Sequence, residues 1–198
     1  RRIAFATGSG NPVYHAHNLY LNNEPIVDMV IPNNIEEVHG WAFYGCTNLT
    51  SAVVANSVTN IGKSAFCYCY GLQTISFGEN LERIGVYALG YCDKLKTVDI
   101  PEGVKTIGES AFSSCTALET VSIPSSLKQI EYNGFEGCSK LKGVYITDLA
   151  AWCGIDFQVA VSDRASNPLY YAKILYLNGE PVSDMVVPDE VENIPAYS

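Results

Sequence analysis

The chain has 198 residues, of which 47% are hydrophobic and only 17% charged, and its formal net charge is −9 at pH 7. This composition can bury a continuous core and excludes a largely disordered chain, and no apolar run approaches the about 18 residues of a membrane-spanning helix. The acidic excess argues against nucleic acid, because phosphate binding needs clustered Lys and Arg, and it leaves proteins, cations and glycans as partner classes.

The N-terminal part of the chain contains a segment that is repeated near the other end. Residues 11–32 are similar in sequence to residues 167–188, at one constant offset. In the second copy, two strand-like runs flank Asn178-Gly179, a pair that suits a type I′ turn since both residues tolerate positive φ. Asn22-Asn23 stands at the same place in the first copy. We expect residues 1–29 to be the end of a preceding long repeat unit with a β-hairpin.

Two histidines in this first unit could in principle hold a metal ion. His15 and His17 would share one face of a strand, because side chains alternate along a strand. Their counterparts in the second copy are Tyr171 and Lys173. The second copy therefore lacks the histidine pair that a metal site common to both units would need. The preferred interpretation is that the two histidines lie on a solvated strand face.

Residues 30–146 contain five regular 23-residue repeats. A period of about 20 to 29 residues with Leu and aliphatic columns is typical of a leucine-rich solenoid, in which each repeat is one coil. No single coil closes a core, so each buries its apolar columns against its neighbours. The repeating columns are a cysteine (Cys46, Cys69, Cys92, Cys115, Cys138), a ring or Leu three residues earlier (Phe43, Phe66, Leu89, Phe112, Phe135) and a Leu three residues later (Leu49, Leu72, Leu95, Leu118, Leu141).

Each coil is predicted to add one strand to a parallel sheet. From Thr120 to Ile123 apolar and polar residues alternate, as expected of a half-buried strand. Val121 and Ile123 should point inward, while Thr120 and Ser122 should point outward. Stacked coils would then place these strands about 4.8 Å apart.

The rest of each coil is predicted to be short elements. Pro residues after the first strand (Pro32, Pro101, Pro124) cannot donate to the sheet and should end it. Val104–Ile107 is predicted to be a second strand on the opposite wall. Glu109 to Cys115 is too short for more than one turn of helix.

Residues 147–188 form a long repeat, predicted to carry a short helix and a second β-hairpin. Thr147 could cap a helix over Asp148 to Cys153 that Gly154 ends. Trp152 and Phe157 would then pack on the last regular coil. Residues 189–198 read as the truncated start of the next repeat, and all these parts should form one solenoid.

With these columns in place, the segment from Ile100 to Val121 (IPEGVKTIGESAFSSCTALETV) resembles the BspA-like family of leucine-rich repeat surface proteins. The resemblance implies an α/β leucine-rich repeat solenoid, right-handed, with β-rich coils, short helical turns and a parallel sheet on the concave face. It also implies a secreted or surface-anchored bacterial protein that adheres to host proteins or other cells. Glu131, where other coils have Gly, and Leu89, where they have Phe, are local departures.

The cysteine column is interpreted as buried free thiols, since free Cys is commonly a small buried hydrophobe. Neighbouring rungs hold parallel Cβ atoms about 4.8 Å apart, whereas a disulfide needs about 3.8 Å. Cys67 and Cys69 remain a weaker candidate for a redox or metal pair, but no second Cys or His pair completes a zinc site. Gly62-Lys63-Ser64 lacks the rest of a phosphate loop and is read as a coil corner. We therefore predict no cofactor and no metal.

The candidate binding surface is the outward face of the sheet, because solenoids usually bind through this surface. Its residues are Thr74, Ser76, Thr97, Asp99, Thr120, Ser122 and Tyr145. Gly143 ends one of the two outward columns. Most of these side chains are small hydroxyls, and only the Tyr145 end, near Trp152, Tyr170, Tyr171 and Tyr176, has the aromatic content typical of binding hot spots.

These observations favour a non-catalytic recognition or adhesion module with protein or glycan ligands. The alternative is a structural spacer that displays another domain of a longer surface protein. An enzyme is not expected, because no acid, base and nucleophile stand in a catalytic pattern.

Overall fold

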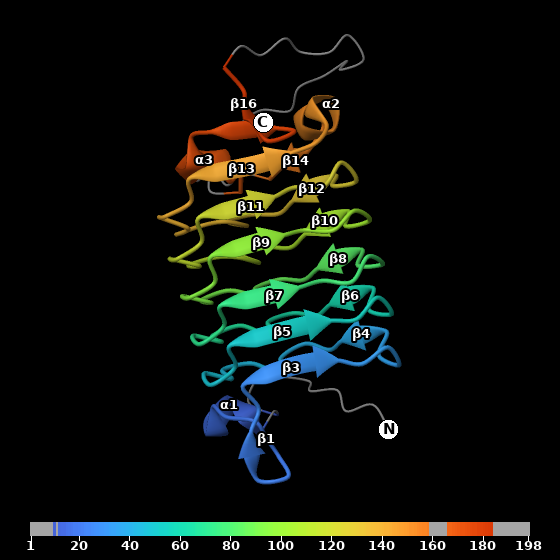
Figure 1. Cartoon of the computed structure of the whole chain (residues 1–198), viewed down its shortest axis with the longest axis vertical. Helices are drawn as coiled ribbons and strands as arrows, with labels where there is room; N and C mark the ends of the chain where they lie inside the picture. Colours follow the sequence, from blue (N-terminus) through green and yellow to red (C-terminus); the bar gives the residue numbers. More distant parts are fainter. Residues whose placement is uncertain (1–9, 11, 159–165, 184–198) are drawn as a thin grey trace.

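The computed structural model describes residues 10, 12–158 and 166–183, which form a parallel β-solenoid of stacked coils (Figure 1). Each regular coil contributes one strand to a main wall and one shorter strand to a second wall. The main-wall strands are β3 (Asp28–Ile31), β5 (Ser51–Val54), β7 (Thr74–Ser76), β9 (Thr97–Asp99), β11 (Thr120–Ser122), β13 (Gly143–Ile146), β15 (Leu175–Leu177) and β16 (Glu180–Pro181). The second-wall strands are β4 (Glu37–Val38), β6 (Asn60–Ile61), β8 (Arg83–Ile84), β10 (Thr106–Ile107), β12 (Gln129–Ile130) and β14 (Asp156–Phe157).

Strand pairing follows the repeat period of the sequence. Thr120 pairs with Thr97 on one side and with Gly143 on the other, both in parallel. The second wall is one parallel sheet from β4 to β14, whereas the main wall consists of the sheets β3-β5-β7 and β9-β11-β13-β15-β16. Among the described main-wall strands, only β16 is antiparallel to its neighbour.

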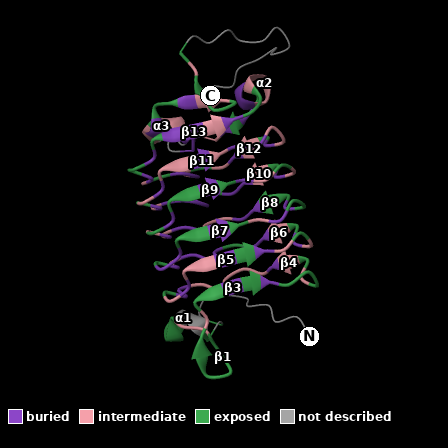
Figure 2. Cartoon of the chain, viewed as in Figure 1, coloured by how far each residue is buried: buried purple, intermediate pink, exposed green. Residues whose placement is uncertain are grey.

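The core runs through the centre of the stack, as the buried residues in Figure 2 show. Val121 is fully buried and Thr120 is half-buried on the other face of β11, as the alternation predicted. The ring column stacks between coils, with Phe43 and Phe66, and likewise Phe112 and Phe135, at 5.1 Å between ring centroids. Each coil therefore depends on its neighbours for its apolar contacts.

All seven cysteines are free and buried, so the predicted burial of the column is confirmed. Four thiols also donate to a backbone carbonyl 26 residues earlier, with Sγ to O distances of 3.1 to 3.4 Å. The donors are Cys69, Cys92, Cys115 and Cys138, and the acceptors are Phe43, Phe66, Leu89 and Phe112. A thiol thus suits this column as a small apolar group that is also a weak donor.

Helical structure is scarcer than the α/β prediction implied. Within the described residues the helices are α1 (Val13–Ala16), α2 (Leu149–Cys153) and α3 (Leu169–Ala172). In the regular coils the segment after the second strand consists of turns. The β-rich part of the prediction is confirmed, and the helical part holds only in the long units.

The short helix of the long repeat is present, but its cap differs from the prediction. Asp148, not Thr147, accepts a hydrogen bond from the backbone N–H of Ala151 at 2.9 Å. Its carboxylate is a preferred N-cap acceptor. Trp152 and Phe157 are buried in the common core with ring centroids 5.2 Å apart. Phe157 pairs with Ile130 of the last regular coil, as expected of it.

The segment around the N-terminal histidines is not a strand, so that prediction was wrong. His15 lies in α1, and His17 follows with a positive φ of 57°. The carbonyl of Pro12 accepts the N–H groups of His15 and Ala16, and it thereby starts the helical turn. The two side chains consequently do not share a strand face.

Both predicted hairpins are confirmed. β1 (Tyr20–Leu21) pairs with β2 (Glu24–Pro25), and β15 pairs with β16. Asn22, Asn23, Asn178 and Gly179 all have positive φ, as the turn requires. Sequence reasoning had both hairpins leaning off the solenoid, but in the second one β15 also pairs in parallel with β13 and so extends the main wall.

Candidate binding surface

The outward face of the main wall carries two columns of side chains, which continue from coil to coil because the strands pair in parallel register. The predicted surface residues lie on it as follows: Thr74, Ser76, Thr97 and Asp99 are exposed, and Thr120, Ser122 and Tyr145 are half-buried. These seven positions are therefore at least partly accessible to a ligand. The chemistry of the face changes from one end to the other.

The middle of this face is polar and partly satisfied by its own contacts. Ser122 donates from its hydroxyl to the carboxylate of Asp99 at 2.7 Å. Similar contacts occur at the N-terminal end of the face, where Ser51 and Thr50 donate to Asp28 at 2.6 and 3.0 Å, and these hydrogen bonds lower the pKa of the Asp28 carboxyl. The middle coils can form hydrogen bonds with a ligand but offer no large apolar anchor.

The C-terminal end of the face is aromatic. The rings of Tyr145 and Tyr176 stack with centroids 4.5 Å apart and planes 6° apart. Gly143, predicted as an outward position, is buried because both rings cover it: a Cβ there would lie 2.8 Å from the ring of Tyr176 and 3.2 Å from that of Tyr145. The absence of a side chain at Gly143 thus allows the tyrosine pair to lie against the sheet.

A cleft of about 330 Å³ adjoins this pair. Its walls include Ser122, Tyr145, Asn178 and Gly179, so that the hairpin turn of the long repeat closes one side. Of the aromatic residues expected near Tyr145, only Tyr176 makes ring contact with it in the part of the chain that the structure describes. The others are engaged elsewhere: Tyr170 packs on Tyr171, and Trp152 packs on Phe157.

The opposite end of the same face is aliphatic; sequence reasoning placed Val53 in an outward column but did not recognise Val30 or an apolar end. Val30 and Val53 are paired neighbours on β3 and β5 and are 70% and 45% exposed. They adjoin an open cleft of about 410 Å³ that also reaches Ser76 and Phe77. The available signal was that the two valines stand exactly one repeat apart, which places both in the outward column of Ser76.

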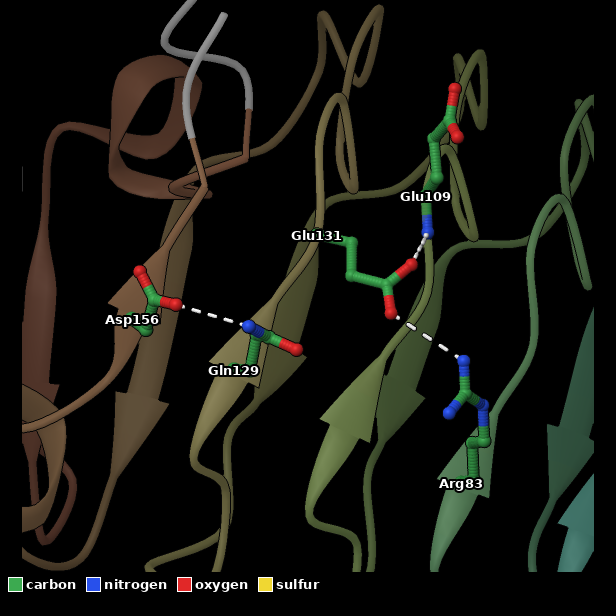
Figure 3. A network of polar contacts seen from close by, with 5 residues as sticks. All are labelled: Arg83, Glu109, Gln129, Glu131 and Asp156. Carbon is green, nitrogen blue, oxygen red and sulfur yellow. Dashed lines mark hydrogen bonds and ion pairs between the residues drawn. The ribbon is translucent and has the colours of Figure 1, made fainter.

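The second wall differs, because its polar groups already contact one another across several coils (Figure 3). Glu131 accepts from the backbone N–H of Glu109 at 3.0 Å, and its other oxygen lies 3.4 Å from the Arg83 guanidinium. Gln129 donates to Asp156 at 3.0 Å. Glu131 therefore bridges three coils where other coils have Gly, and this wall is a weaker candidate for ligand binding.

A third surface carries a cluster of tyrosines that the sequence reasoning did not single out. Tyr68 stacks on Tyr91 with centroids 4.5 Å apart and contacts the rings of Tyr44 and Tyr70 at 5.3 and 5.8 Å. This cluster lies on the turns that follow the second-wall strands in each coil. The spacing of Tyr68 and Tyr91 by one repeat was the only signal of it in the sequence.

In the described ranges no three His, Cys, Asp or Glu side chains are grouped so that they could hold a metal ion. Burial raises the pKa of the Cys67 thiol to about 12 and that of Cys69 well above its usual range. Both thiols are therefore protonated at neutral pH, which does not suit a thiolate role. No helix in the described part is long and apolar enough to cross a membrane.

Comparison with known proteins places this geometry in a family. The sequence model described as the BspA type leucine rich repeat region matches residues 16–142 in six copies. A search of curated protein sequences found no match.

Several solved structures resemble the chain. A leucine rich cell surface protein from Faecalibacterium prausnitzii matches 68% of this chain with 32% identity and a TM-score of 0.64. The leucine rich repeat protein of T. pallidum matches 61% with 34% identity and a TM-score of 0.59. A leucine-rich repeat protein from Bacteroides ovatus matches 68% with 34% identity and a TM-score of 0.56. The matches cover only 36%, 58% and 37% of those chains.

Proposed function

The chain belongs to the BspA-type leucine-rich repeat family, a protein-interaction fold, and we propose that it is a non-catalytic recognition module presented outside the cell or at its surface. Its ligands would be proteins or glycans of a host or of other cells, and binding would serve adhesion. The location is supported by the similar protein of Faecalibacterium prausnitzii, which is described as a cell surface protein.

One observation carries the proposal: the stacked Tyr145 and Tyr176 rings beside the cleft at the C-terminal end of the main wall. Aromatic side chains contribute most to binding where they are held rigidly and partly shielded from water. Here Gly143 lets both rings lie on the sheet, and Asn178 supplies polar groups at the rim. The polar columns of the middle coils would extend the contact area and add hydrogen bonds.

A second candidate function is a structural spacer that displays another part of a longer surface protein. The small hydroxyl side chains of the middle coils favour it, because they include no residue type enriched in binding hot spots. The two functions differ in what the tyrosine pair does. A spacer needs it only for stability, whereas a recognition module needs it for ligand contact.

A solid-phase binding screen against extracellular-matrix proteins and their glycans distinguishes them. Tyr145→Ala should weaken saturable binding at least about tenfold, as expected for loss of an aromatic hot spot. Tyr132→Ala is the control, because Tyr132 is an exposed tyrosine that lies outside the main wall. Equal binding by both variants and the unaltered chain would argue against the site, and no saturable binding to any ligand would favour the spacer.

A further inference from the structure

The tyrosine cluster on the third surface adjoins a further cleft, separate from the main wall. Its volume is about 350 Å³, and its lining residues are His15, His17, Tyr44, Gly45, Thr47, Tyr68 and Tyr70. The cleft thus lies at the seam between the N-terminal unit and the first coils. Its size is within the range of small-molecule sites, about 300 to 1,000 Å³.

Contacts between the two units hold this seam together. The backbone N–H and the hydroxyl of Thr47 both donate to the carbonyl of His17, at 3.0 and 3.3 Å. Gly45 leaves room for the His17 imidazole, because a Cβ at this position would lie 3.1 Å from Nδ1 of His17. The cleft therefore results from the packing of the N-terminal unit on the first coil.

The cleft offers an aromatic platform. Tyr68 is held between Tyr44 and Tyr91, and Tyr70 beside it is 43% exposed. Ring faces carry partial negative charge, so they attract the weakly positive C–H groups that a sugar ring presents on its flat side. Sugar hydroxyls would meet the phenol, imidazole and Thr47 hydroxyl groups around the platform.

A carboxylate stands next to this platform. Asp93 occupies the position of Tyr70 in the neighbouring coil, one repeat further along the chain. Equivalent residues of neighbouring coils stack side by side, and Asp93 is half-buried there. Burial and the charge of Asp93 both raise the pKa of the Tyr70 phenol. A carboxylate beside an aromatic ring can accept two hydroxyl hydrogen bonds from one sugar.

The composition of the cleft favours an uncharged ligand that is rich in hydroxyl groups. None of its seven described lining residues is Lys or Arg, and the chain has a formal net charge of −9. Among these described residues, phosphate, sulfate or carboxylate groups would therefore meet no permanently charged partner. None of the seven is Val, Leu or Ile either, whereas peptide side chains are usually held in apolar pockets.

We propose that the cleft between the N-terminal unit and the first coils binds neutral oligosaccharides, with the exposed ring of Tyr70 stacking on a sugar ring and the packed ring of Tyr68 supporting it. This site is independent of the main-wall surface. One chain would then have two recognition sites on different faces, which increases avidity for a ligand-bearing surface when both can engage.

The test is titration calorimetry of the whole chain with four neutral hexasaccharides: cellohexaose, maltohexaose, mannohexaose and the chitin hexamer. At least one should bind, and Tyr70→Ala should weaken that binding about tenfold or more, comparable with the loss of a stacking ring in other ligand sites. Tyr132→Ala is the matched control, since Tyr132 is 44% exposed and outside the cleft, and it should leave binding unchanged. Tyr70→Leu keeps an apolar side chain without a ring and should bind as weakly as Tyr70→Ala.

Three results would overturn the proposal. The first is no binding of any of the four sugars to the unaltered chain, and the second is equal binding by the unaltered chain and both Tyr70 variants. Heparin oligosaccharide and decaproline are titrated in the same way as a charged and a peptide ligand, and the third result is Tyr70-dependent binding of only one of these two. Melting curves of each variant keep the result interpretable, because Tyr70 is exposed and its replacement should leave the melting temperature within a few degrees of the unaltered chain.

Discussion

Replacing Leu118 by Ala tests the packing of the solenoid at its centre. Leu118 is fully buried in the column that each coil shares. The change removes three carbon groups worth about 0.8 kcal/mol each on burial and leaves a cavity between coils, so we expect a loss of about 3 to 5 kcal/mol, within the range of buried Leu to Ala changes. At 198 residues, each kcal/mol lowers the melting temperature by about 2 to 4 °C.

The matched control is Thr120→Ala, two residues along the same coil but on the outward face. Its cost should stay below about 1 kcal/mol, the span of β-propensity effects. Thermal and urea unfolding followed by circular dichroism measure both variants. Equal losses for Leu118→Ala and Thr120→Ala would refute the assignment of inward and outward faces.

Three further predictions concern other parts of the chain. Gly143→Ala should displace the Tyr176 ring, because the new Cβ would lie 2.8 Å from it. The near-ultraviolet circular dichroism of the tyrosine pair should change, and stability should fall by about 0.5 to 1.5 kcal/mol. An unchanged spectrum would contradict the placement of the Tyr176 ring over Gly143. Asp148→Ala should cost about 0.5 to 2 kcal/mol in urea unfolding by removing the cap of α2, whereas Thr147→Ala should cost nothing measurable. Burial raises the pKa of the thiols of Cys46, Cys67 and Cys138 to about 12, so the folded chain holds the three thiol protons more tightly than the unfolded chain. The contribution of these buried thiols to stability should be complete below about pH 8.5 and decline as the pH rises from there towards 12. Melting temperatures at neutral and alkaline pH will check this, and a melting temperature that does not fall at alkaline pH would contradict it.

The regular coils could be predicted closely because their signals are local and repeated. The alternation of Thr120, Val121 and Ser122 specifies both faces of a strand within three residues. The spacing of the cysteine column then sets the pairing register of neighbouring coils, since equivalent residues must stack to close the core. A chain of identical periods leaves little choice of topology.

The long units could not be predicted as well, because their register does not follow the period of the regular coils. Tyr176 reaches Tyr145 through the pairing of β15 with β13, across the insertion of the long repeat. His17 meets Thr47 only because the N-terminal unit docks on the first coil. The α1 helix spans four residues, too few to show a helical period.

At the main wall, the composition of the sequence indicated Tyr145 but not its partner or the cleft. Gly143 read as an ordinary outward position, whereas its lack of a side chain is what seats both rings. Contacts of this kind depend on the distance between neighbouring backbones. They are therefore visible only once the coils are stacked.

The two long units share one internal geometry, which bears on how such a chain can change in length. Ile26 donates to Leu19 at 2.8 Å, and Val182, its counterpart in the second unit, donates to Leu175 at 2.9 Å. The first unit is docked to the coil that follows it, through Thr47, and the second to the coil that precedes it, through Val144. A gene duplication or deletion that spans one long unit and its five regular coils would therefore again place a long unit between two regular coils. The new junction would repeat the contacts that a long unit already makes with its neighbours. Recombination could lengthen or shorten the solenoid in whole steps while every coil kept its neighbours, so that its length could evolve without refolding any part.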